Sequence, residues 1–94
     1  MPVSEVLKKA IETYGKGPQT LKYIEESGEL LQAIAKYQFS NGTENEREAL
    51  DHLQEEIADC CIMLEQMKMM YGEKKIDQKI IEKAARLAER LKNS

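Results

Sequence analysis

The sequence predicts an all-α fold, an antiparallel bundle of about four helices that is completed by oligomerisation. Between clusters of glycine and proline the apolar residues recur at intervals of three and four, and no segment alternates with a period of two. The 94 residues are enough for one core, so residues 1–94 are expected to form a single domain. One stretch, residues 43–71, carries an apolar face too wide for one partner helix.

The first two helices are separated by the turn at residues 15–18, GKGP. Ser4 is a candidate N-cap for a short first helix. Pro18 suits the first position of the second helix, which is expected to run from about Gln19 to Phe39 and to stop at residues 40–42, SNG. The apolar row of the first helix consists of Val6, Leu7, Ala10, Ile11 and Tyr14.

The third helix is expected to start at a capping box formed by Thr43 and Glu46 and to continue to Tyr71, with Gly72 ending it. About 28 residues at 1.5 Å each span roughly 42 Å, whereas a compact chain of this length has a radius of gyration of only about 12 Å. We therefore expect a homo-oligomer, a dimer or a tetramer. The apolar residues of this helix form two rows, Leu50, Leu53, Ile57, Cys61, Leu64, Met67 and Tyr71 in one and Cys60, Met63 and Met70 in the other.

A fourth helix follows, to about Lys92. Its apolar stripe consists of Ile76, Ile80, Ala84, Leu87 and Leu91.

Charge and hydropathy argue against two classes of partner. Fourteen basic and seventeen acidic residues give a net charge of −3 and an isoelectric point near 5.2, which disfavours nucleic acid. The longest unbroken apolar run, residues 60–64, is too short to span a membrane, and the first residues lack the apolar core of a signal peptide. Cys60 and Cys61 are adjacent on a helix and cannot bridge each other. Both are expected to be small core residues. The expected location is the cytoplasm.

Four carboxylates lie on or beside the inward faces of the two central helices. Glu26 falls in the apolar row of the second helix and Glu29 borders that row. Glu56 and Asp59 hold the same relationship to a row of the third helix. Acids are abundant in this chain, so it is their position relative to the apolar rows that carries the prediction.

An antiparallel hairpin places these acids at matching heights. Counted from Gly42, Glu26 lies 16 residues back and Asp59 17 forward, while Glu29 lies 13 back and Glu56 14 forward. Carboxylates that converge in an apolar region repel one another unless a cation neutralises them. An all-oxygen set without His or Cys favours Mg²⁺, or Mn²⁺, over Zn²⁺.

A simpler alternative is that these acids are solvated or salt-bridged at the edge of the bundle. Lys22 and Lys36 are then the candidate ion-pair partners.

Residues 25–30, EESGEL, and residues 55–59, EEIAD, resemble the EExxE…ExxD signature of the MazG-like all-α nucleoside triphosphate pyrophosphohydrolases, over roughly residues 19–91. The resemblance implies Mg²⁺ held by Glu26, Glu29, Glu56 and Asp59. It implies catalytic roles for Glu25 and Glu26, with Glu25 as a further ligand or an activator of water. Enzymes of this family cleave between the α and β phosphates, releasing a monophosphate and pyrophosphate. Removal of unwanted deoxynucleotides or non-standard nucleotides is the implied role.

Contacts to a triphosphate are expected from cationic and polar side chains. In the resembling family, basic residues of the late helix contact phosphates, sometimes from a neighbouring subunit, and Lys83 and Arg86 match that position best. Gln19 and Lys22 precede the first acidic motif, where the family often places base or phosphate contacts. The competing interpretation is a solvated basic face, composed of Lys79, Lys83, Arg86 and Arg90 and balanced by Glu82 and Glu89.

Two alternatives to this function stay open, and one is excluded. A phosphoribosyl-ATP pyrophosphatase is similarly small, helical and acid-rich, and a non-catalytic helical oligomer or interaction module would use the acids structurally. A carboxylate di-iron bundle needs Glu-x-x-His on two helices, but Ala49 stands three residues before the only histidine, His52. His52 is expected on the surface. The sequence does not identify the preferred base.

Overall fold

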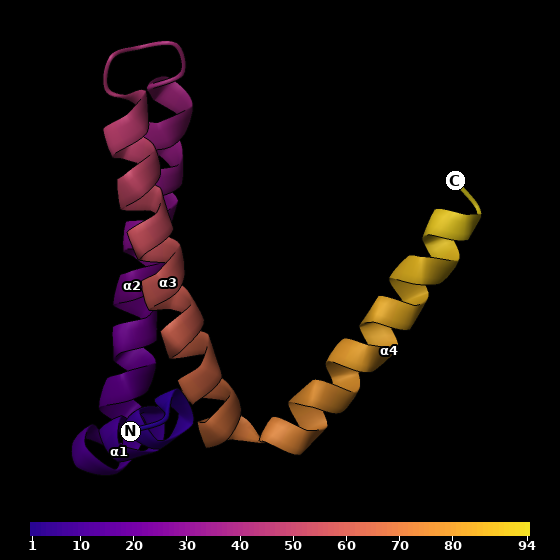
Figure 1. The fold of residues 1–94 in the computed structure, drawn as a ribbon. Coiled ribbons are helices and arrows are strands. Elements are labelled where there is room, and N and C mark those ends of the chain that lie inside the picture. The colour runs from indigo at the N-terminus through magenta and orange to yellow at the C-terminus, as the bar shows by residue number, and fades with distance from the viewer.

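The computed structural model describes all 94 residues. The chain forms four helices and no strand. These are α1 (Val3–Tyr14), α2 (Lys16–Phe39), α3 (Glu46–Tyr71) and α4 (Glu73–Lys92). Helices α2 and α3 form a long antiparallel hairpin, α1 packs near the end where α2 begins, and α4 leaves the end of α3 to form an open V with the hairpin (Figure 1). The all-helical prediction is confirmed.

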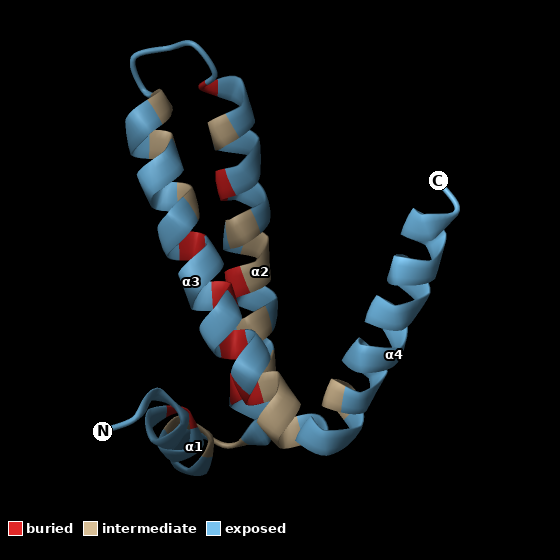
Figure 2. Ribbon diagram, turned by 45° about the vertical axis from the view of Figure 1, so that its right-hand side comes forward, coloured by how far each residue is buried: buried red, intermediate tan, exposed pale blue.

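The seam between α2 and α3 has a heptad-like spacing that alternates four and three residues. Figure 2 shows that the buried residues of the hairpin lie along this seam. Such spacing keeps one stripe of each helix facing its partner, as in a coiled coil. All the seam residues are buried or half-buried: Gln19, Tyr23, Glu26, Leu30, Ala33 and Tyr37 on α2 with Ser40 at its C-cap, and Ala49, Leu53, Glu56, Cys60, Met63, Met67 and Met70 on α3.

The first two helices begin earlier than the sequence predicted. Helix α1 begins at Val3, so Ser4 lies inside it and is not the N-cap, because the carbonyl of residue 2 already accepts the first helical hydrogen bonds. Gly15, with φ of 91°, is the only residue between α1 and α2, and α2 begins at Lys16. Pro18 therefore lies within the first turn, where its missing N–H leaves no helical bond unmade.

The start of α3 also differs from the predicted capping box. The helix begins at Glu46 with Asn45 at the N-cap position and no side-chain capping bond. The Thr43 hydroxyl accepts from the Asn45 N–H at 3.2 Å, and the Glu46 carboxylate accepts from the Gly42 N–H at 3.4 Å. The two side chains therefore close the loop ahead of the helix instead of capping a helix that starts at Thr43.

Gly72 ends α3 as predicted. Its left-handed conformation, with φ of 117°, redirects the chain at once into α4. Lys68 and Asp77 form an ion pair of 2.7 Å across this junction. Helix α4 contacts only α3, and none of its residues is buried.

Much of the apolar face predicted for α3 is exposed in the single chain. Cys60 and Met63 pack against α2, whereas Leu50, Ile57 and Leu64 are 37%, 45% and 47% exposed. Cys60 is buried as predicted, whereas Cys61 is exposed in the single chain, because a step of 100° from Cys60 carries it out of the seam.

The isolated chain is extended for its size. Its radius of gyration is 16.8 Å, against about 12 Å for a compact domain of this length. Its accessible surface is 7409 Å², against about 5,500 Å² for a compact monomer of this mass. None of the four helices combines the length and apolar character needed to cross a membrane.

Candidate metal centre

Three carboxylates meet near the middle of the α2–α3 hairpin. One oxygen each from Glu26, Glu29 and Glu56 lies within 4.8 Å of the others, and we call this set the acidic cluster. Glu26 and Glu56 are buried in the seam, while Glu29 is exposed at its edge. This is the convergence that the sequence predicted for these three residues, with Glu29 and Glu56 at matching heights on the two helices.

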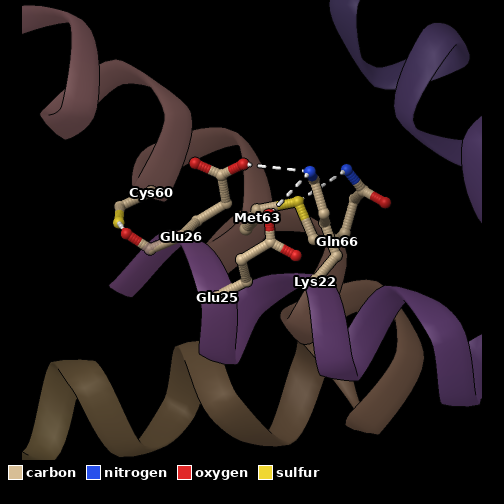
Figure 3. Close-up of polar contacts among 6 residues, drawn as sticks. All are labelled: Lys22, Glu25, Glu26, Cys60, Met63 and Gln66. Carbon is tan, nitrogen blue, oxygen red and sulfur yellow. Dashed lines mark hydrogen bonds and ion pairs between the residues drawn. The ribbon is translucent and has the colours of Figure 1, made fainter. Parts of the chain in front are cut away.

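Asp59 lies outside the acidic cluster. It is exposed on α3, and the residue that meets Glu26 across the seam is its neighbour, Cys60. The Cys60 thiol donates a hydrogen bond of 3.4 Å to the backbone carbonyl of Glu26 (Figure 3). The predicted level match of Glu26 with Asp59 is therefore displaced by one residue, because Cys60 and not Asp59 occupies the seam row of α3.

Two oxygens of the acidic cluster have no hydrogen-bond donor. Oε2 of Glu26 and Oε2 of Glu56 are both buried and unpartnered. Their other oxygens have cationic or titratable neighbours, with Lys22 Nζ 3.3 Å from Glu26 Oε1 and His52 Nε2 3.9 Å from Glu56 Oε1. A buried carboxylate oxygen without a donor is costly unless a cation lies beside it. The donor set and these orphaned oxygens fit a hard divalent cation such as Mg²⁺ or Mn²⁺.

The electrostatics of the site reflect this concentration of negative charge. The Glu26 carboxylate, the partial burial of the site and the Glu56 carboxylate together raise the pKa of Glu29 above its ordinary value of 4.5. The hydrogen bond to Glu26 and the charge of Glu25 raise the pKa of Lys22. Burial, reinforced by the nearby acids, raises the pKa of the Cys60 thiol. Glu29, Lys22 and Cys60 therefore hold their protons more strongly than the isolated side chains would.

Glu25 lies beside the acidic cluster without joining it. Its side chain is 61% exposed, and its carboxylate lies 3.6 Å from Lys22 Nζ (Figure 3). Lys22 thus contacts both Glu25 and Glu26, as the simpler ion-pair interpretation anticipated for this lysine. Lys36 has no ion pair in the chain.

The predicted substrate-binding residues are spread over the molecule. Gln19 is buried at the far end of the seam and donates a hydrogen bond of 2.7 Å to Gln66, so its amide is engaged within the hairpin. Lys22 adjoins the acidic cluster. Lys83 and Arg86 are exposed on α4, which diverges from the hairpin, so one chain does not bring them to the acids (Figure 1).

Two side chains near the site were not singled out as site residues from the sequence. His52 is on the surface, as expected, with a side chain 48% exposed, but it also lies next to Glu56. The i, i+4 spacing of these two residues was the available signal. His52 also borders an open hollow of about 590 Å³ between the end of α2 and the start of α3. Gln66, which contacts Gln19 and Met63, shares the heptad row of His52 and Asp59.

The chain offers an all-carboxylate cluster at the centre of an antiparallel helical hairpin, with a lysine at its edge. Such a site suits a divalent cation and the phosphate oxygens that such cations bind. No family model matches the chain, and no curated protein or solved structure matches it either.

Proposed function

We propose that the protein is a Mg²⁺-dependent nucleotide pyrophosphohydrolase that cleaves nucleoside triphosphates between the α and β phosphates. The observation that carries the proposal is the acidic cluster, in which two buried carboxylate oxygens lack any donor. The resemblance of residues 25–30 and 55–59 to the MazG-like signature narrows a general metal site to this reaction.

Glu26, Glu29 and Glu56 are the residues that would hold the cation. Asp59, which completes the set in the resembling family, lies on α3 one turn after Glu56. When bound, a divalent cation supplies charge neutralisation at the phosphates and lowers the pKa of a neighbouring water. Glu25 is the group we assign to accepting the proton of that water, because its carboxylate is exposed beside the cluster.

Binding of the phosphates is proposed to use cations from two sources. Lys22 already lies between Glu25 and Glu26, so its ammonium is placed to meet a phosphate at the edge of the cluster. Lys83 and Arg86 would serve the acidic cluster of a second copy, since α4 points away from its own hairpin. Self-association as a homodimer or homotetramer is therefore part of the proposal.

The proposed substrates are deoxynucleoside or non-standard nucleoside triphosphates in the cytoplasm. The proposed role is their removal before polymerases incorporate them, as the resemblance implies. Phosphoribosyl-ATP is the alternative substrate of the same chemistry.

The test is release of pyrophosphate and of phosphate from a panel of ribo- and deoxyribonucleoside triphosphates, with Mg²⁺ and with EDTA. We expect pyrophosphate and a monophosphate, only with metal, from wild type and from Glu55→Gln, but not from Glu56→Gln. Glu55 is an exposed neighbour of Glu56 on the same helix. Comparing the two variants therefore distinguishes loss of the buried Glu56 carboxylate from a general effect of replacing an acid on α3. No release from the panel or from phosphoribosyl-ATP, by folded protein with Mg²⁺ or Mn²⁺, would contradict the proposal and favour a non-catalytic module.

A further inference from the structure

The acidic cluster opens on one long side of the α2–α3 hairpin. Glu29, its exposed member, belongs to the α2 row that flanks the seam on this side, and Lys36 continues that row toward the loop. The flanking rows on the opposite side meet each other at the hydrogen bond of 2.8 Å between Thr20 and Tyr71. A ligand therefore reaches the cluster from the side that carries Glu29.

An open hollow adjoins the acidic cluster on the same side, next to the loop between α2 and α3. We call it the loop hollow, and its volume is about 590 Å³. Its wall includes Lys36, Phe39, Asn45, Glu48 and His52. His52 also lies next to the cluster, with its Nε2 3.9 Å from Glu56 Oε1. The step from His52 to Glu56 corresponds to about 6 Å along α3, so the loop hollow begins about one helical turn from the cluster.

The loop hollow offers an aromatic surface and unengaged polar groups. Phe39 is 87% exposed, the highest value among the large apolar side chains, so its ring is open to a ligand. Asn45 and Glu48 make no side-chain hydrogen bond or ion pair within the chain. A phenyl ring beside a free amide and a free carboxylate suits a planar ring that carries donors and acceptors on its edge. The volume of the loop hollow is in the usual range for a small-molecule site.

Hydrogen bonds hold the loop that forms one wall of the loop hollow. The hydroxyls of Ser40 and Thr43 donate to the backbone carbonyls of Tyr37 and Ser40, each at 2.7 Å. The Glu46 carboxylate accepts from the Gly42 N–H at 3.4 Å. The wall is therefore formed before a ligand arrives, which lowers the entropic cost of binding.

We infer that the loop hollow receives the base of the nucleotide whose phosphates lie at the acidic cluster. In a nucleoside triphosphate a single sugar separates the base from the α phosphate, which matches the single helical turn between the loop hollow and the cluster. Phe39 stacks on the base, and Asn45 and Glu48 meet its edge. The inference rests on the proposed function for the identity of the ligand. It deepens that function by assigning the residues that select the base.

The opposite end of the hairpin offers no equivalent place for the base. The resemblance implies a base or phosphate contact from Gln19, but this side chain is buried and donates a hydrogen bond of 2.7 Å to Gln66. The one other hollow of the chain lies on α4, which diverges from the hairpin (Figure 1). That hollow has no aromatic side chain, since it is lined by Arg86, Glu89, Arg90 and Asn93. The loop hollow is therefore the only one beside the acidic cluster.

The inference is tested by fluorescence on the full chain with Mg²⁺. Because the chain contains no tryptophan, Phe39→Trp gives it a single indole at the loop hollow. Tyr14→Trp places the same reporter at another exposed aromatic position, at the end of α1 near the start of α2. The probes are α,β-methylene analogues of the deoxynucleoside triphosphates, which resist cleavage between the α and β phosphates, and inorganic tripolyphosphate, which has no base. We expect at least one analogue to quench Phe39→Trp saturably, tripolyphosphate to leave it unchanged, and no analogue to quench Tyr14→Trp.

The fluorescence result and the pyrophosphate assay of wild type fail independently. Equal quenching of Tyr14→Trp, or no quenching of Phe39→Trp by any analogue, would overturn the inference. Pyrophosphate release by wild type without quenching of Phe39→Trp would leave the proposed function standing and overturn the inference alone. Quenching of Phe39→Trp without pyrophosphate release would uphold the loop hollow as a base site and count against the enzymatic function.

Isothermal titration with the analogue that quenches most strongly gives a second reading that does not depend on a reporter. Phe39→Ser should bind it about tenfold more weakly than wild type, because the stacked ring is lost. Phe39→Tyr keeps the ring, and Tyr14→Ser removes an aromatic side chain outside the loop hollow, so both should bind like wild type. Circular dichroism verifies that the variants are helical. A folded Phe39→Ser variant with wild-type affinity would contradict the stacking contact and the inference with it.

Discussion

Glu26 and Glu56 occupy seam positions on opposite helices, and each buries one carboxylate oxygen that no donor reaches. Seam positions of a helical hairpin are normally apolar, and leaving a buried acceptor unsatisfied costs about 1–3 kcal/mol. Lys22 compensates one of the two carboxylates through its contact of 3.3 Å with Glu26. The hairpin therefore carries a local destabilisation that a bound cation would remove.

Replacing Glu56 by Gln removes one of these charges without changing the size of the side chain. In EDTA the variant should melt at a higher temperature than wild type, because repulsion among Glu26, Glu29 and Glu56 is relieved. Addition of Mg²⁺ should raise the melting temperature of wild type and leave the variant almost unchanged. Thermal unfolding followed by circular dichroism measures both effects. Glu55→Gln is the control, and an equal Mg²⁺ response in all three proteins would contradict a metal site at Glu56.

The raised pKa of Glu29 predicts how metal-free stability depends on pH. A carboxyl group whose pKa is higher in the folded than in the unfolded protein contributes stability below its ordinary value of 4.5, and this contribution is lost as the pH rises through the raised value. Without metal, wild type should therefore lose more stability than Glu29→Gln as the pH is increased from below 4.5 toward neutrality. Melting temperatures of the two proteins in EDTA, compared across that range, check the sign. A Glu29→Gln variant whose pH profile parallels that of wild type would show that Glu29 is not coupled to the other acids.

The central part of the site was predictable because it depends on local rules. Glu26 and Glu56 sit in apolar rows, and a short turn between two long helices forces an antiparallel pairing. Two helices held in this way bring Glu29 to the same height as Glu56. Asp59 was assigned to the same group because it borders the row at the right height. Its side chain is exposed because Cys60, the next residue, is the one that enters the seam.

The placement of α4 was not predictable from periodicity. Its stripe of apolar residues indicates a face that needs covering, but does not say what covers it. The direction of the helix depends on Gly72, whose positive φ admits a sharp change of direction between α3 and α4. The distance of Lys83 and Arg86 from the acidic cluster follows from that single backbone position.

Gly72 should consequently resist substitution. An alanine there meets no neighbouring atom within 4 Å, so its cost is backbone strain at φ of 117°, about 1–2 kcal/mol. Gly28 provides the matched control, because it lies inside α2 with equally open surroundings and no positive φ. Gly28→Ala should stabilise the protein by up to about 1 kcal/mol. Chemical denaturation of the two variants measures the opposite signs, and a neutral Gly72→Ala would contradict the strained junction.

The Cys60 thiol should be unreactive in the folded protein. Burial raises its pKa, and it donates to the carbonyl of Glu26, so the thiolate that a disulfide reagent requires is scarce at neutral pH. In Cys61→Ser protein, the remaining thiol should react with an aromatic disulfide only as fast as the chain unfolds. The same protein in denaturant should react at once, which verifies that the thiol is intact. Rapid labelling of the folded variant would show that the seam opens at Cys60.

The basic row of α4 provides the test that separates phosphate binding from metal binding. Arg86 is exposed and distant from the acidic cluster of its own chain, so Arg86→Ala should leave Mg²⁺ binding to the free protein unchanged. If a second copy presents Arg86 to a triphosphate, the variant should raise KM or lower kcat for pyrophosphate release, because a charge-assisted contact is lost. Lys74→Ala, which removes an exposed cation from a different face of the same helix, should behave like wild type in both measurements. Isothermal titration with Mg²⁺ and steady-state kinetics give the two readings. An Arg86→Ala variant that binds Mg²⁺ more weakly would contradict a role confined to phosphate. Unchanged kinetics would instead place the row of α4 among solvated surface charges.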